Sequence, residues 1–190
     1  MKKLFFVLVV FLSLDASAQE LFVFTEPASN MPAKSLGVRD MNAFMFEKDG
    51  KLNYHNMPEL MWGINKKWMV HVQGFISNRQ EGGLKAEGGS FYAKYRFLSL
   101  DEVHKHFRMA AFAQGSISRN NPFYDELSLE GDQSGFQYGI IATQLVNKLA
   151  VSATMSNIQV LQESRWNKDL PQQYPYQAID YTLSVGYLLF

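Results

Sequence analysis

Apolar and polar side chains alternate between positions 57 and 73, and this period of two constrains the fold more than any other feature. One parity is apolar and consists of Leu60, Trp62, Ile64, Trp68, Val70 and Val72. The other parity consists of Met57, Glu59, Met61, Met69, His71 and Gln73. Successive side chains of a strand point to opposite faces of a sheet, so the pattern predicts two strands joined at a tight turn, Asn65–Lys67.

The same alternation recurs along the chain, in segments that are separated by residues typical of turns. We expect strands near Leu36–Phe46, Leu52–Ile64, Trp68–Ser77, Ala86–Leu98, Phe107–Ser118, Gly135–Val146, Leu149–Ile158 and Ala178–Leu189. Most have about ten to twelve residues, close to the roughly nine to eleven of membrane-spanning strands and longer than the about five or six of ordinary strands. The sequence therefore predicts an all-β fold, an up-and-down antiparallel transmembrane β-barrel with about eight strands.

The composition of the two faces indicates which one points outward. The polar parity is rich in small residues, which suit a narrow lumen: Gly37, Ala43, Gly63, Gly88, Ser90, Ser152, Ser156, Ser184 and Gly186. The apolar parity is typical of a band that faces lipid: Trp62, Ile64, Trp68, Val70, Val72, Phe91, Tyr95, Phe97, Ile140, Val151, Tyr181, Leu183, Val185 and Tyr187. We therefore expect the apolar face to be outside.

The lengths of the connections predict an orientation. The long polar connections Arg119–Ser134 and Gln162–Gln177 alternate along the chain with short ones such as Asn65–Lys67 and Asn147–Lys148. Transmembrane barrels carry short turns at the periplasmic rim and long loops at the other rim. The short turns and both ends of the barrel are therefore expected in the periplasm.

The first eighteen residues resemble a signal peptide. Lys2 and Lys3 precede the apolar run Leu4–Leu14, and Ala16–Ala18 are small residues that a signal peptidase accepts. The run is too short for a membrane helix, which needs about twenty residues. We expect cleavage before Gln19, a periplasmic lead-in at 19–34 and one barrel domain at 35–190.

Composition excludes several classes of protein. Cysteine is absent, so the chain has neither disulfides nor a thiolate metal site. Lysine and arginine total 18, as do aspartate and glutamate, so the chain has no excess of positive charge that would favour binding to nucleic acid.

Together these features resemble a Gram-negative outer-membrane β-barrel protein. A vaguer likeness to small barrels of that class is carried by ELFVFTEPASNMPAKSLGVR and MPELMWGINKKWMVH. The resemblance implies an outer-membrane location, contact with outer-membrane lipid and insertion by the assembly machinery, but it implies no activity. At the C-terminus, Leu189 and Tyr187 occupy the alternate positions of the apolar face, whereas Phe190 falls on the positions of the opposite face. Either the last strand bulges or the chain is part of a larger barrel.

One inward patch carries soft donor atoms. The turns place Met61 opposite His71, Met41 opposite Met57 and Arg39 opposite Glu59, with His55 and Met69 on the same face. Thioethers and imidazole together suit Cu(I), so His71, Met61, Met57, Met41 and His55 are candidate metal ligands. The alternative is that the methionines only fill an irregular lumen. The Arg39–Glu59 pair is expected to neutralise charge, and His104 and His106 beside Asp101 form a weaker candidate for a divalent metal.

We expect a non-enzymatic barrel with a role in passive transport, envelope structure or surface contact. It needs no cofactor, and its possible ligands are a small solute or a copper ion. A copper-binding or copper-transporting barrel is the first alternative. A lipid-modifying outer-membrane enzyme is the second, although the chain has no G-x-S-x-G motif and no evident serine–histidine arrangement.

Overall fold

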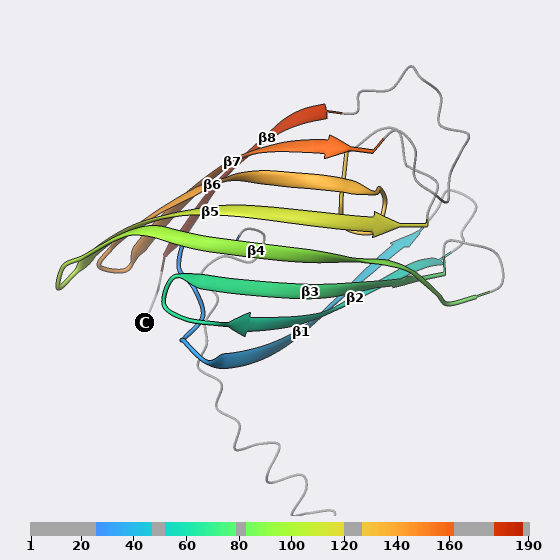
Figure 1. Cartoon of the computed structure of the whole chain (residues 1–190), viewed down its shortest axis with the longest axis horizontal. Coiled ribbons are helices and arrows are strands. Elements are labelled where there is room, and N and C mark those ends of the chain that lie inside the picture. Colours follow the sequence, from blue (N-terminus) through green and yellow to red (C-terminus); the bar gives the residue numbers. More distant parts are fainter. Residues whose placement is uncertain (1–25, 47–51, 79–82, 120–126, 162–176, 188–190) are drawn as a thin grey trace, which may run out of the picture.

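The computed structural model contains one antiparallel sheet that curls into a half-barrel (Figure 1). The structure describes residues 26–46, 52–78, 83–119, 127–161 and 177–187. The strands are β1 (Ser35–Phe46), β2 (Leu52–Gly63), β3 (Trp68–Ser77), β4 (Lys85–Asp101), β5 (Lys105–Ser118), β6 (Gly135–Val146), β7 (Leu149–Val160) and β8 (Gln177–Tyr187). Each strand pairs with its neighbour in the chain, which confirms the predicted all-β, up-and-down topology.

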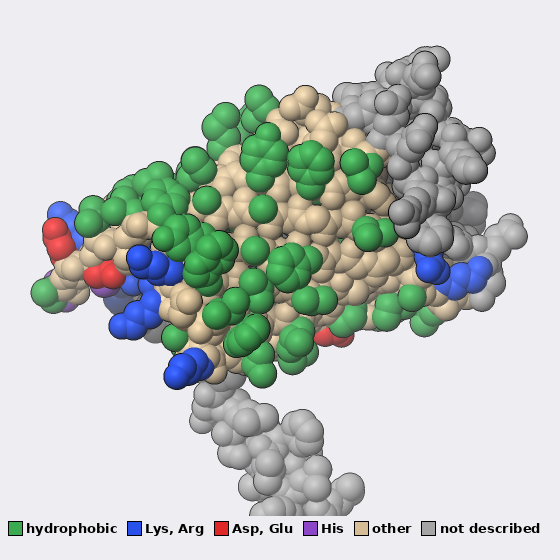
Figure 2. Space-filling view, viewed as in Figure 1, with side chains coloured by type: hydrophobic (Ala, Val, Ile, Leu, Met, Phe, Trp, Pro, Cys, Tyr) green, Lys and Arg blue, Asp and Glu red, His purple; other side chains and the backbone are tan. Residues whose placement is uncertain are grey.

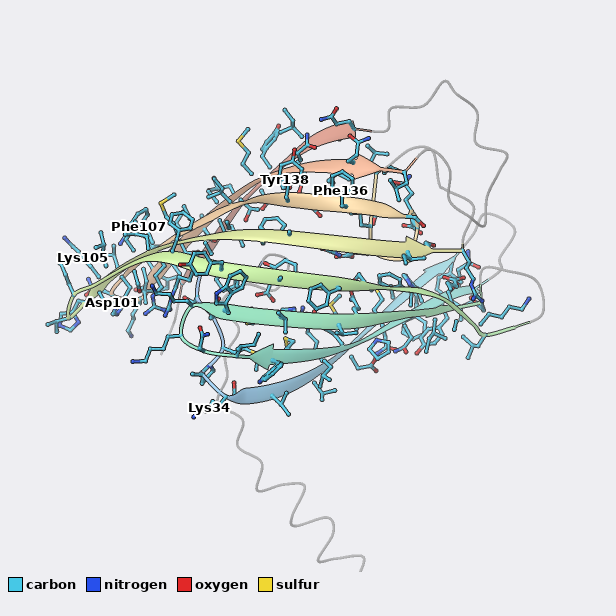
Figure 3. All side chains as sticks on the ribbon, in the orientation of Figure 1. Lys34, Asp101, Lys105, Phe107, Phe136 and Tyr138 are labelled. Carbon is cyan, nitrogen blue, oxygen red and sulfur yellow. The ribbon has the colours of Figure 1, made fainter. Side chains whose placement is uncertain are left out.

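The strands follow the predicted segments closely, with one clear extension. The β4–β5 hairpin continues to Asp101 and Lys105, whereas a longer turn was expected between Ser99 and His106. A register shift between Arg96 and Leu98 adds a residue to β4. The hairpin projects past the neighbouring turns (Figure 3). A bulge adds one residue to a strand, and a pattern of alternating residues shows it only where the apolar positions switch from odd to even numbers.

The two expected tight turns are both present in the structure. Asn147 adopts φ 52° in the tight turn between β6 and β7, a conformation that asparagine tolerates. The Asn65 carboxamide accepts hydrogen bonds from the backbone N–H groups of Lys67 and Trp68 and so stabilises the turn between β2 and β3. The expected long connections, and the end of the last strand at 188–190, lie wholly or partly outside the described residues.

The outer, convex face of the sheet is apolar. Val38 is 80% exposed and Tyr181 is 81% exposed, and many other large apolar side chains share this face (Figure 2). The concave face instead buries polar side chains, among them Glu59, His71 and Lys94. This arrangement agrees with the predicted parity and is the reverse of a soluble barrel, which places its apolar face inside.

A small polar cluster interrupts the apolar outer face on β1 and β2. The carboxamide of Asn56 donates to Asp40 Oδ1 at 2.6 Å and to Asn42 Oδ1 at 2.9 Å. The hydroxyl of Tyr54 also donates to Asn42 Oδ1, at 2.6 Å. These groups satisfy one another, which lowers the cost of an apolar environment.

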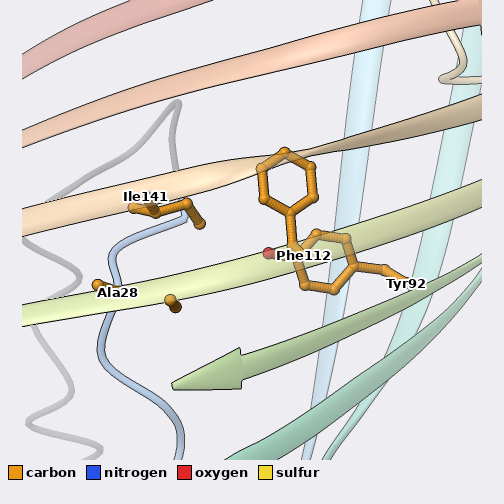
Figure 4. Packing of buried hydrophobic residues seen from close by; sticks show 5 residues of the cluster. Ala28, Tyr92, Phe112 and Ile141 are labelled. Atoms are coloured by element: carbon orange, nitrogen blue, oxygen red, sulfur yellow. The ribbon is translucent and has the colours of Figure 1, made fainter. Parts of the chain in front are cut away.

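Residues 26–34, here called the N-terminal strap, run along the concave face. Ala28 is fully buried and packs with Tyr92, Phe112 and Ile141 (Figure 4). Its N–H donates to Thr143 Oγ1 at 2.9 Å. The described part of the expected lead-in is therefore packed inside the half-barrel, whereas 19–25 lies outside the described residues.

A second segment, 127–134, fills the opposite end of the lumen. Leu129 is buried against Ile158 and Val160. Gly131, at φ 96°, lies so close to His55 and Phe75 that a Cβ at this position would come within 2.9 Å of His55 Nε2. The half-barrel is thus filled from both ends by its own chain.

The two edges of the sheet are more open than its centre. β1 and β8 form the edges among the described residues. The inward side chains of β8 are all partly exposed, whereas inward residues of β7 such as Ser152 and Ile158 are buried. Within the described ranges, no helix is long and apolar enough to cross a membrane.

Candidate functional site

Glu59 is the centre of a buried ionic network on β1, β2 and β3. Arg39 Nε donates to Glu59 Oε2 at 2.7 Å, and this contact confirms the predicted cross-strand pair. His71 Nδ1 lies 2.7 Å from the other carboxylate oxygen, Oε1. Glu59 and His71 are only 6% and 3% exposed, so water screens these contacts little. The Arg39–Glu59 pair thus does neutralise charge inside the lumen, and it also orients a histidine.

A second network ties the strap to the sheet. Lys94 is fully buried, and its Nζ donates to the carbonyl oxygens of Pro27 and Ser29 at 2.7 and 2.9 Å. The same Nζ lies 3.1 Å from Glu26 Oε2. Arg108 Nη1 adds a hydrogen bond to Ser29 Oγ at 2.9 Å. The sequence carried no signal that the strap would be the partner of these two cations.

Three methionines gather at the strap end of the lumen. Met61 is the cross-strand partner of His71, as predicted, and Met69 lies two residues before His71 on the same face. The N–H of Met31 lies 3.3 Å from Met69 Sδ. The methyl carbons of Met31 and Met61 lie 2.9 and 3.2 Å from the point where Gly37 would carry a Cβ. Met31 joins this cluster only because the strap folds inward, so sequence analysis missed it.

The remaining candidate ligands lie farther along the lumen. Met57 pairs with Met41 in the ladder between β1 and β2, as expected. His55 lies at the other end, with its ring centre 6.1 Å from that of Phe75. His55 lies six positions before Met61 on β2, about 20 Å at 3.3 Å per residue. The five candidates therefore line one face but do not converge on one point.

His71 carries an unsatisfied buried atom. Its Nε2 is buried and has no hydrogen-bond partner among the described residues, and the same holds for the hydroxyl of Tyr92. The rings of these two residues are 5.0 Å apart. Buried polar atoms without partners are uncommon and call for a specific explanation, such as an ion or a water molecule. In the tautomer that carries its proton on Nδ1, facing Glu59, an imidazole has a free lone pair on Nε2, and here that atom faces the lumen.

The weaker candidate, at the β4–β5 hairpin, is a local ion-pair cluster. His106 Nδ1 lies 2.8 Å from Asp101 Oδ1, and Arg108 Nη2 donates to the same oxygen at 2.9 Å. The positive charge of Arg108 beside the Asp101 carboxylate disfavours the binding of a metal cation at this position. Across the described residues, no three His, Asp or Glu side chains are grouped so that they could hold a metal ion.

Comparison of the chain with known proteins identifies no relative. No family model, no curated protein and no solved structure matches it.

Proposed function

We propose that this chain is an integral outer-membrane β-barrel protein without enzymatic activity. The observation that carries the proposal is the distribution of side chains across the sheet. Large apolar residues cover the outer face, while glutamate, lysine and histidine are buried on the inner face. Such a surface is unfavourable in water but matches the hydrocarbon core of a bilayer.

The lengths of the strands support the same location. The strands have 10 to 17 residues, enough for the roughly nine to eleven that a tilted strand needs to cross the membrane. Trp62 and Trp68 are partly exposed on either side of the β2–β3 turn. Indole rings favour the interface between lipid and water, so this turn is suited to one rim of the barrel.

The filled lumen favours some roles over others. The strap and the 127–134 segment occupy the two ends of the concave face. Passage of a solute would require at least one of them to move. We therefore favour an envelope-structural or surface-contact role over passive transport.

A membrane location imposes one further requirement. Unpaired N–H and C=O groups cost several kcal/mol each in hydrocarbon. The edges at β1 and β8 must therefore be closed, either against each other or through further strands, as in a larger barrel. Outer-membrane lipid and the barrel assembly machinery are the partners that this proposal implies.

Fractionation tests the proposal directly. The protein should be recovered with the outer membrane, and it should migrate faster on a gel when it is not heated than when it is boiled. Recovery in the soluble periplasmic fraction would overturn the proposal.

A further inference from the structure

The unsatisfied nitrogen of His71 has the surroundings of a metal ligand. A metal-binding histidine almost always donates its second ring N–H to a carboxylate or carbonyl, which fixes the tautomer and the orientation of the ring. Glu59 fills this role at 2.7 Å, and Arg39 in turn holds Glu59. His71 is 3% exposed, so its Nε2 is presented to the interior of the lumen and not to bulk solvent.

Three methionines on the same face as His71 offer soft donor atoms near its ring. Met61 comes from the neighbouring strand, Met69 from the same strand and Met31 from the strap. Directly opposed residues have Cβ atoms about 4.5 to 5.5 Å apart, so Met61 is within reach of the imidazole by rotation of its side chain. Met31 and Met61 already approach the same point above Gly37, and Met31 contacts Met69.

The donor set selects the metal. Imidazole suits several transition metals, but thioethers prefer the soft ion Cu(I), and neither cysteine nor a carboxylate cluster offers a harder or stronger alternative in the described part of the lumen. We propose that the lumen binds one Cu(I) ion, with His71 Nε2 as the nitrogen ligand and the thioethers of Met31, Met61 and Met69 as sulfur ligands. The ion satisfies the orphaned nitrogen. It also links the strap to β2 and β3.

This assignment divides the inward methionines into two sets. Met41 and Met57 face each other on β1 and β2, and Met57 lies four residues before Met61, about 13 Å along the strand. They therefore serve as a matched control, with the same side chains in the same lumen but outside the proposed site.

Retention of Cu(I) against a chromophoric Cu(I) chelator tests the site, under anaerobic reducing conditions and with the purified whole chain. The protein should retain one equivalent of Cu(I), and excess Zn(II) should not displace it. Replacement of Met31, Met61 and Met69 by leucine should weaken binding by more than the roughly 10- to 100-fold that loss of an outer-shell partner costs. The control variant, Met41→Leu with Met57→Leu, should bind as the original protein does.

X-ray absorption at the copper edge gives a second readout that needs no variant. Sulfur scatterers together with nitrogen are expected; a shell of nitrogen and oxygen alone would overturn the proposal. So would the absence of retained copper, which is the result expected if a water molecule bridges His71 Nε2 and the Tyr92 hydroxyl. The site does not depend on a membrane location, because every ligand lies inside the lumen. Copper retention and membrane fractionation can therefore fail separately.

Discussion

The ammonium group of Lys94, fully buried in the half-barrel, lies 3.1 Å from the carboxylate of Glu26, which is 68 residues earlier in the chain. This contact holds the N-terminal strap against the concave face. It makes the strap part of the folded domain, because a buried lysine without these partners would be strongly unfavourable.

Replacement of Lys94 tests this role of the strap. Lys94→Met removes three strap contacts, and we expect the free energy of unfolding to fall by about 1 to 3 kcal/mol, because the carbonyl oxygens of Pro27 and Ser29 lose a charged donor. Residues 26–34 should also become accessible to protease. Lys148→Met, at an exposed turn, is the control and should change stability by less than about 0.5 kcal/mol. Denaturant titration measures both variants, and equal stabilities would contradict the assigned role.

Gly63 makes room for the strap, and its replacement should displace it. A Cβ at this position would lie 2.3 Å from the carbonyl oxygen of Pro32, too close for the backbone to accommodate without moving. We expect Gly63→Ala to lower the free energy of unfolding by about 1 to 3 kcal/mol, the usual cost of overpacking. Gly115→Ala is the matched control on β5, because a Cβ there has open space within 4 Å. Comparable losses in both variants would show that the strap is not the cause.

A charge on the outer face distinguishes lipid from water. Leu183 lies near the middle of β8 and is 72% exposed. If this face contacts lipid, Leu183→Arg should destabilise the protein by about 2 to 4 kcal/mol. The same substitution at a water-exposed site usually changes stability by less than about 0.5 kcal/mol. Unfolding from lipid vesicles measures the difference, and a negligible change would contradict the membrane location.

Hydrogen exchange tests whether the edges of the sheet are closed. A bilayer does not tolerate unpaired strand edges, so amides of β1 and β8 should exchange as slowly as those of the central strands β4 and β5 when the protein is in its native membrane. Fast exchange along either edge strand would show that the edge is open to water and would argue against a membrane-spanning sheet.

Epitope tags test the orientation. Tags inserted in the connection Arg119–Ser134, ahead of the packed segment 127–134, and in the connection Gln162–Gln177 should be accessible on the surface of intact cells. A tag at Asn147–Lys148 should require a permeabilised outer membrane. The reverse pattern would refute the predicted orientation while leaving the β fold unaffected.

The local sequence pattern was sufficient to predict the strands and the residue pairings close to the turns between them. A period of two assigns each side chain to a face, and a short turn then sets the register. For these reasons Met61 opposite His71 and Arg39 opposite Glu59 were both predictable. The same pattern also placed Trp62 and Val72 on the outer face, where the structure shows them exposed.

Contacts between distant segments required the tertiary structure. The sequence by itself determined which face most strand residues occupy, because that depends on alternation along the backbone, but it did not reveal the register shift between Arg96 and Leu98. Only the folded chain decided that the strap lies inside, that Glu26 meets Lys94 and that Met31 joins Met61 and Met69. The sequence of the strap has no periodic pattern from which its position could be predicted. The strap binds in space left by Gly37 and Gly63, and it pairs with cations from other strands. The unsatisfied nitrogen of His71 likewise emerges only when every neighbour is in place, because a missing partner is a property of the whole environment and not of the residue.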